Sequence, residues 1–193
     1  ETDAWGLDVV VSGSQKGWMV APGLAFVSVS ERAWQAQQRC STPRMYFDLR
    51  RAQSSQESGQ TPWTPAISLM FQLRRAIAML REEGIDKVWA RHHATAELVR
   101  TGLERLGLDF FAEEGARSDT VTAICPPNGI AADDIRALAR SEFDTVFAGG
   151  QADLRGQIFR FGHLGYTSAQ EVQGALDAIE GSLTKLGHTV AAG

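Results

Sequence analysis

The chain is organised around one stretch, Asp8-Val9-Val10-Val11-Ser12-Gly13-Ser14-Gln15-Lys16-Gly17. The β-branched run from Val9 to Val11 predicts a short strand that is buried on both faces. The strand stops at a serine, and a turn bounded by Gly13 and Gly17 then presents one lysine. Ligands of α/β sheets gather just beyond strand ends, so Lys16 is a candidate Schiff-base lysine. The alternative is an ordinary exposed turn lysine, which these residues alone favour.

The composition of the whole chain is that of an ordinary globular protein. Its 193 residues are 44% hydrophobic and 22% charged, which suffices for a core in one domain or slightly more. A net charge of −4 argues against a nucleic-acid surface, and no apolar run reaches the length of a membrane span. Cys40 and Cys125 lack the spacing of a metal site and favour a reduced, cytoplasmic setting.

The first residues of the chain are unusual. Glu1 to Gly6 contain no methionine, and an apolar strand follows almost at once. We therefore expect this chain to be the later part of a longer protein. An engineered start is the alternative, but it does not explain a strand with nothing before it to pack on.

The first third of the chain predicts a hairpin followed by helices. Leu24 to Val29 form a second apolar strand, which the intervening loop allows to return antiparallel, and Ser30 caps a short helix. Residues 41–63 are expected to be a long polar loop that Met45-Tyr46-Phe47 anchors. Thr64-Pro65 then open a helix that carries an apolar stripe and ends near Gly84.

The rest of the chain predicts a small α+β layer sandwich, with a domain change near residues 82–85. A helix over 86–106 is expected to turn Val88, Ala96, Val99, Leu103 and Leu106 inward and to close at Gly107. The tail from His188 is expected to fray. The remaining expected elements are strands over 109–111, 120–125, 145–148 and 157–161 and helices over 131–141 and 168–186.

The histidines are interpreted as structural residues. His92 and His93 lie next to each other on a predicted helix and therefore face different directions, which argues against a metal pair. His163 could line a pocket, but a lone histidine is more often packed or at the surface. No metal site is predicted.

Several motifs together resemble one family, the class V pyridoxal-phosphate aminotransferases, and within it the alanine–glyoxylate and serine–pyruvate type. The resemblance runs from residue 1 to about residue 186. The motifs occur in the family's order and are Ser12-Gly13-Ser14-Gln15-Lys16-Gly17 with Ala21-Pro22-Gly23-Leu24, then Gln60-Thr61-Pro62-Trp63-Thr64-Pro65-Ala66, then Gly149-Gly150, then Phe159-Arg160-Phe161-Gly162-His163-Leu164-Gly165. Ordered motifs are far more specific than one lysine turn, and they reverse the preference for an inert lysine.

The resemblance implies an α/β fold, namely the C-terminal portion of a fold-type-I transferase that uses pyridoxal 5'-phosphate. Residues 1–82 would complete the mixed sheet of the large cofactor-binding domain, and residues 83–193 would form the small α+β domain. Family members also carry an N-terminal half that holds the aspartate for the pyridine nitrogen, a ring-stacking aromatic residue and a phosphate loop. We therefore expect the N-terminal half of the same protein as a partner, and a homodimer with shared active sites.

The resemblance also implies a role for each site residue. Lys16 would bond the cofactor aldehyde as an internal aldimine and then move a proton between the substrate and the cofactor. Gln15 would lie near the cofactor, with a turn side chain that bonds its own backbone as the alternative. Gln60 and Thr61 stand before a predicted helix start, where anions bind readily. They would reach the cofactor phosphate of the neighbouring subunit.

Arg160 stands inside an apolar strand between two phenylalanines, a costly position for an unpaired charge. Its planar fork suits a carboxylate, and the family places its substrate-carboxylate arginine here. A structural salt bridge is the alternative. The implied reaction moves an amino group from a small amino acid, such as alanine or serine, to a 2-oxo acid such as glyoxylate or pyruvate, with ping-pong chemistry.

Two rival functions remain open. A lyase or desulfurase of the same superfamily would need a reactive cysteine on a loop, and Cys40 is the candidate, although its sequence surroundings show no obvious activator. A non-catalytic half-subunit would present an open apolar sheet edge and would need a partner chain.

Overall fold

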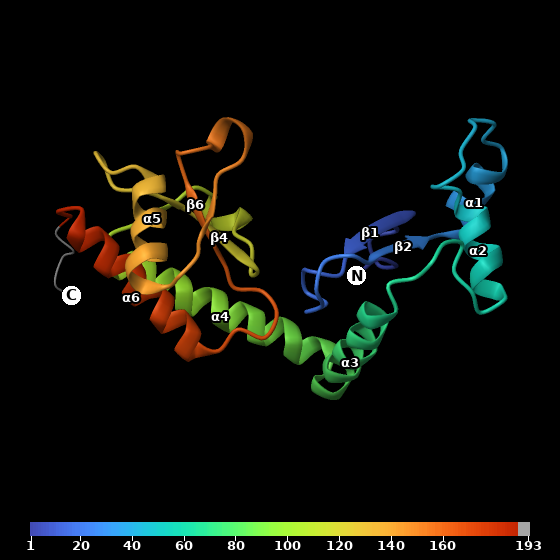
Figure 1. Ribbon diagram of the computed structural model, residues 1–193, viewed down its shortest axis with the longest axis horizontal. Helices are drawn as coiled ribbons and strands as arrows, with labels where there is room; N and C mark the ends of the chain where they lie inside the picture. The colour runs from blue at the N-terminus through green and yellow to red at the C-terminus, as the bar shows by residue number, and fades with distance from the viewer. Residues whose placement is uncertain (189–193) are drawn as a thin grey trace. The chain divides into compact units, whose positions relative to one another are not determined.

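A computed structural model describes residues 1–188, and the fraying predicted for the tail lies largely outside them (Figure 1). The chain forms two compact units, Glu1–Met79 and a second unit that begins at Leu80. The assignment of residues 1–82 to a large cofactor-binding domain stays a prediction. Each unit is described by itself.

The first unit contains a two-stranded antiparallel hairpin. β1 (Val9–Gly13) pairs with β2 (Ala25–Val29), and Val11 lies opposite Val27, so the predicted antiparallel return is confirmed. The predicted burial of both faces is wrong, because the side chain of Val9 is 53% exposed and that of Val11 70% exposed. The register places Val9, Val11 and Val27 on one face, which no element of the first unit covers among the described residues.

The other face of the hairpin holds the polar and aromatic side chains. Phe26 lies opposite Ser12 on this face. The indole of Trp18 packs on Phe26 with ring centroids 5.2 Å apart, and its Nε1 donates a hydrogen bond of 2.8 Å to the Ser12 hydroxyl. One face is therefore closed by the loop that follows β1, and the valine face is open.

Two helices follow the hairpin, and one of them was not predicted. α1 (Glu31–Gln38) begins as expected, because the Ser30 hydroxyl accepts the Ala33 N–H. α2 (Leu49–Glu57) lies inside the segment that we expected to be a loop, and this prediction is wrong. The Asp48 side chain caps α2 by accepting the Arg50 N–H. No residue of α2 is buried, so its sequence has no apolar stripe by which a helix could be predicted.

α3 (Ile67–Glu83) begins two residues after Pro65 and ends just before Gly84, whose φ of +87° is the conformation that glycine adopts most readily. The predicted end is confirmed. Its apolar stripe is largely uncovered within this unit, because Phe71 is 66% exposed and the only buried residue of the described helix is Ala76.

The second unit is a four-stranded antiparallel sheet with helices packed on it (Figure 1). The strand order is β3-β4-β6-β5, with every neighbouring pair antiparallel. The predicted layer sandwich is confirmed, although the strand expected over 145–148 pairs only at its end. The elements are α4 (Ile85–Arg105), β3 (Asp109–Phe110), β4 (Val121–Cys125), α5 (Ala132–Phe143), β5 (Ala148–Gly149), β6 (Phe159–Gly162) and α6 (Ala169–Lys185).

One core lies between the sheet and the three helices. Leu103 of α4, Ile124 of β4, Phe159 of β6 and Ile179 of α6 are fully buried members of it. α4 contacts β4 and α6, and α5 contacts β5, β6 and α6, so the helices share one face of the sheet. The residues that we expected α4 to turn inward are all buried, which confirms that prediction.

The close approach of α6 to α4 depends on a glycine. A Cβ at Gly102 would stand 2.3 Å from a methyl carbon of Leu176, so a larger residue would push the two helices apart. α4 then ends at Gly107, which adopts a φ of +71°. α6 begins with a capping box in which Ser168 and Glu171 bond each other's backbone N–H groups.

Candidate active site

The lysine turn at the end of β1 is organised by Ser14. This side chain is fully buried. Its hydroxyl donates a hydrogen bond of 2.8 Å to the Ala21 carbonyl and accepts the Leu24 N–H at 3.1 Å. Its backbone N–H donates to the Leu24 carbonyl, and its carbonyl accepts the Val20 N–H. Ser14 is therefore a turn-forming residue that ties the loop from β1 to β2 into a closed ring.

Lys16 projects from this ring as an exposed side chain. Its carbonyl accepts the Met19 N–H at 2.9 Å, and Met19 adopts a φ of +59°, so the turn reverses sharply after the lysine. Within residues 1–188 the Lys16 ammonium group makes no hydrogen bond or ion pair. The backbone is thus fixed while the amine is free to react.

Gln15 and Gly13 fit a flat group beside the lysine. A Cβ at Gly13 would stand 2.8 Å from Oε1 of Gln15, the movable end of an exposed side chain. Gln15 is exposed next to Lys16. An amine that can form an imine and an adjacent amide at a strand end are together compatible with pyridoxal phosphate.

Gln60 and Thr61 lie between α2 and α3, and both are exposed. The N–H of Gln60 bonds the Ser55 carbonyl near the end of α2, and the Thr61 hydroxyl donates to the Trp63 carbonyl at 2.7 Å. Our expectation that they stand just before a helix start is wrong, because α3 begins only at Ile67. Phosphate binding by this pair therefore has no support from the dipole of α3, and it stays a prediction from the family resemblance alone.

Arg160 lies on the face of the second unit's sheet opposite to the core. Phe159 and Phe161 are buried in the core, and alternation along β6 turns Arg160 to the other side. Its Nε donates a hydrogen bond of 2.8 Å to the Gly149 carbonyl. No carboxylate pairs with it in the described part of the chain, so the alternative of a structural salt bridge has no partner there.

The structure thus groups the predicted site residues only in part. Lys16 and Gln15 share one turn, and Gln60 and Thr61 stand elsewhere in the first unit with no hydrogen bond to that turn. Arg160 belongs to the second unit.

Cys40 has an activator that we did not expect. The Thr42 N–H, the Thr42 hydroxyl and the Arg44 guanidinium, in this order of effect, lower the pKa of the Cys40 thiol from 9.0 to about 7. Nη1 of Arg44 lies 3.0 Å from the sulfur, and the thiol is exposed. The interpretation that Cys40 lacks an activator was therefore wrong. The signal was present in the sequence as a hydroxyl two residues on and a cation four residues on.

His92 and His163 are buried within the second unit, and His93 is not. His92 is buried, with Nδ1 2.7 Å from the Val88 carbonyl and Nε2 accepting the Gly165 N–H at 2.9 Å, whereas His93 is exposed and contacts Asp119. Their opposite directions are as predicted. His163 is also buried, with Nε2 2.9 Å from the Thr122 hydroxyl. Burial, and next the charge of Arg100, lower the pKa of His163 from 6.5 to about 4.

The described residues hold neither a membrane-spanning helix nor a cluster of metal ligands. Residues 1–188 contain no helix that is long and apolar enough to cross a membrane. They also bring together no group of three or more potential metal ligands among histidine, cysteine, aspartate and glutamate.

Comparison with known proteins identifies relatives over nearly the whole chain. The family model "Aminotransferase class-V" matches residues 1–153, a range that contains Lys16, Gln15, Gln60 and Thr61 and stops before Arg160. A serine–glyoxylate aminotransferase of Methylorubrum extorquens is 34% identical, over 100% of this chain and 50% of its own length. A protein of Synechococcus sp. named as the small subunit of a soluble hydrogenase is 42% identical, over 97% of this chain and 48% of its own length.

Solved structures show the same half-length match. An alanine–glyoxylate aminotransferase of Nostoc sp. superposes with a TM-score of 0.89 at 30% identity, over 94% of this chain and 49% of its own. Its fold is that of the fold-type-I transferases, so the predicted fold class is confirmed. The chain spans about half the length of the relatives that it matches.

Proposed function

This chain belongs to the class-V aminotransferase family, and on that premise we propose that it forms the C-terminal half of a pyridoxal-phosphate-dependent transaminase. Enzymes of this family depend on pyridoxal phosphate. The observation that carries the proposal is the Lys16 turn, where a clamped backbone presents an unpartnered amine at the end of a strand. The proposed reaction moves an amino group from a small amino acid, alanine or serine, to a 2-oxo acid such as glyoxylate or pyruvate.

In this mechanism Lys16 has two tasks. Its Nζ would hold the cofactor, and once a substrate amine had taken its place the same amine would move a proton at the substrate α-carbon. Pyridoxal phosphate, when bound, would supply the electron sink for the reaction. The closed ring around Ser14 supports this account, because it fixes the backbone that carries the Nζ.

The other site residues bind and orient. The guanidinium of Arg160 binds the substrate carboxylate, a role that its free terminal nitrogens support. Gln15 lines the cofactor beside Lys16. Gln60 and Thr61 contact the cofactor phosphate of a second subunit, so the proposed enzyme is a homodimer with shared sites. The last proposal requires Thr61 to release its bond to the Trp63 carbonyl.

The same proposal names the N-terminal half of the protein as a partner. The open valine face of the hairpin, which consists of Val9, Val11 and Val27 with Ala25 and Val29, supports it. Large exposed apolar faces mark surfaces that pack on other protein. The relatives have about twice the length of this chain, so the half of each relative that this chain does not match could supply such a partner.

The experiment that tests the function compares two lysines of the complete protein. Lys16→Ala is expected to lower transamination of alanine or serine by at least roughly 10³-fold, because both the covalent anchor and the proton carrier are lost. Lys87→Ala is the matched control, since Lys87 is an exposed lysine of α4, and it should keep the wild-type rate. Full activity of Lys16→Ala would refute the proposal.

The low pKa of Cys40 favours a second candidate, a lyase or desulfurase of the same superfamily. A thiol with a pKa of about 7 is about half thiolate at neutral pH and can attack sulfur or an activated carbon. Cys40→Ala separates the two candidates in one preparation. Unchanged transamination with no elimination or sulfur release supports the transaminase, whereas loss of a measurable release activity supports the second candidate.

A further inference from the structure

The surroundings of Arg160 suggest how its guanidinium is aimed. Ala123 of β4 and Ala148 of β5 are its register partners on the two sides of β6. Directly paired residues point to the same face, so both neighbours of the arginine carry only a methyl group. The guanidinium therefore has lateral room on a face that the core does not occupy.

One edge of the guanidinium is already taken. Its Nε–H is donated to the Gly149 carbonyl at 2.8 Å. Arginine has five N–H groups, so four remain on Nη1 and Nη2. Within residues 1–188 these four have no acceptor, and only the end of the fork is available to a ligand.

The direction of the Gly149 carbonyl depends on the next residue. Gly150 donates its N–H to the Ile158 carbonyl at 3.0 Å, which closes the loop between β5 and β6. A Cβ at Gly150 would stand 1.9 Å from the Leu154 carbonyl oxygen and 2.5 Å from its carbon. Both are backbone atoms, so any side chain at Gly150 must displace the loop or the peptide that joins Gly149 to Gly150.

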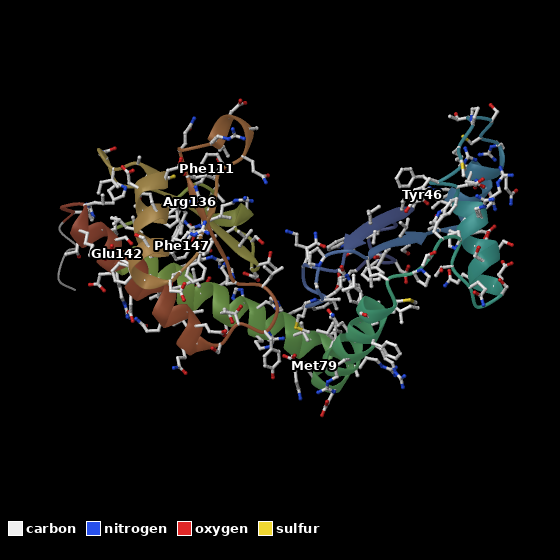
Figure 2. All side chains as sticks on the ribbon, in the orientation of Figure 1. Tyr46, Met79, Phe111, Arg136, Glu142 and Phe147 are labelled. Atoms are coloured by element: carbon white, nitrogen blue, oxygen red, sulfur yellow. The ribbon has the colours of Figure 1, made fainter. Side chains whose placement is uncertain are left out.

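Gly149 itself is constrained much less. A Cβ there would stand 2.8 Å from Nη1 of Arg136, the far end of a long side chain. Arg136 lies on α5 near Phe147, whose carbonyl accepts its Nε–H (Figure 2). The two adjacent glycines therefore differ: a methyl group meets a movable side chain at one and fixed backbone at the other.

We infer that the Gly149–Gly150 peptide is a positioning element for Arg160. It occupies Nε and holds the guanidinium so that Nη1 and Nη2 together bind one carboxylate end-on, with two parallel N–H···O bonds. The inference rests on the proposed role of Arg160. Under this inference Gly150 sets the affinity for every carboxylate substrate, amino acid and 2-oxo acid alike. A change at Gly150 leaves the chemistry at Lys16 unchanged.

The experiment compares Gly150→Ala with Gly174→Ala in the complete holoenzyme, because a Cβ at Gly174 of α6 would meet no atom within 4 Å. The probe is propionate, an unreactive monocarboxylate, whose Kd is measured by calorimetry. Gly150→Ala is expected to weaken propionate roughly tenfold and to raise KM for amino acid and 2-oxo acid by a similar factor, with kcat within about twofold. Gly174→Ala should stay within about twofold of the wild type. An unchanged Kd in a folded Gly150→Ala protein would overturn the inference.

Arg160→Lys separates this inference from the proposed function. It keeps the charge and loses the fork, and it should weaken propionate at least tenfold. If Arg160→Lys binds propionate normally, the proposed role of Arg160 fails. If Arg160→Lys is weak and Gly150→Ala is normal, only the positioning role fails.

Ala148→Leu keeps the inference testable if Gly150→Ala does not fold. Ala148 is exposed beside Arg160, and a leucine there leaves Gly149 and Gly150 unchanged. An end-on carboxylate would meet the larger side chain, so propionate should bind several-fold more weakly. Wild-type affinity in Ala148→Leu would contradict the end-on direction.

Discussion

The two units of this chain differ most in how much apolar surface each buries within itself. In the first unit, the described buried apolar residues are Val20 and Ala76. In the second, a cluster of buried residues from all three helices and from β4 and β6 forms a continuous core. The second unit therefore has what it needs to fold by itself, whereas the first holds the lysine turn by hydrogen bonds and leaves its valines open. The proposed chemistry thus lies in the unit that depends more on other protein.

The largest effect expected from this difference appears when the chain is divided. Residues 80–193 alone are expected to unfold cooperatively on heating, because their core is self-contained. Residues 1–79 alone are expected to show no cooperative transition. Circular dichroism against temperature measures both. A sharp transition in residues 1–79 would show that the hairpin and α3 have a core that the described contacts lack.

A substitution inside the second core sharpens the comparison. Leu103→Ala removes a fully buried side chain of α4 and should lower the free energy of unfolding by about 2 to 5 kcal/mol. Leu98→Ala on the same helix is the control, because Leu98 is 41% exposed, and it should cost under about 1 kcal/mol. Urea unfolding of the whole chain measures both values. Equal costs would mean that burial in this unit does not decide its stability.

Acid provides a smaller and reversible perturbation of the second unit. The pKa of His163 is about 4 when folded and 6.5 when unfolded, so between these values the unfolded state binds more protons. The contribution of neutral His163 to the free energy of unfolding is therefore fully present above pH 6.5, and it is lost as the pH falls toward 4. The two pKa values give a loss of roughly 2 to 3 kcal/mol at pH 4.5.

The contribution of His163 is isolated by comparing two variants between pH 7 and pH 4.5. His163→Gln should lose less free energy of unfolding over this interval than the wild type, because its buried side chain cannot take up a proton. His93→Gln, which changes an exposed histidine, should lose as much as the wild type. An equal loss in all three proteins would mean that His163 is not the group that titrates.

The smallest effect is expected on the open face of the first unit. Val11→Thr should change the stability of this chain by under about 0.5 kcal/mol, because the valine is 70% exposed. In the complete protein the same change should lower stability by about 1 to 3 kcal/mol, because it buries a hydroxyl. Thermal unfolding of both forms measures the difference. The same small effect in both forms would mean that the valine face is not an interface.

The sequence predicted the second unit better than the first for a physical reason. α4 and α6 pack on elements of this same chain, so their apolar periodicity matches the surface that they bury. α3 has an equally clear stripe but no partner for it within the first unit, so the stripe predicts the helix and not what covers it. α2 is polar on all sides and was missed, since periodicity detects only helices with an apolar face.

The candidate site was predictable as residue types but not as geometry. Lys16 and Arg160 could be named from their sequence neighbours, whereas the bond from Arg160 to Gly149 depends on the pairing of β5 with β6. The contact that fixes Gly150 involves a carbonyl four residues away, and it exists only once the loop has closed. The helix start was expected at Thr64-Pro65, shortly after Thr61. The helix α3 begins only at Ile67, so Gln60 and Thr61 do not stand directly before it.

The central claim is that Lys16 is the lysine that carries the cofactor, and one measurement tests it directly. The complete protein is loaded with pyridoxal phosphate, reduced with borohydride and digested, and the modified peptide is identified by mass spectrometry. We predict an adduct on Lys16 and none on Lys87 or on Lys185, which pairs with Glu142. A reduced cofactor adduct on any other lysine, with Lys16 unmodified, would contradict the account.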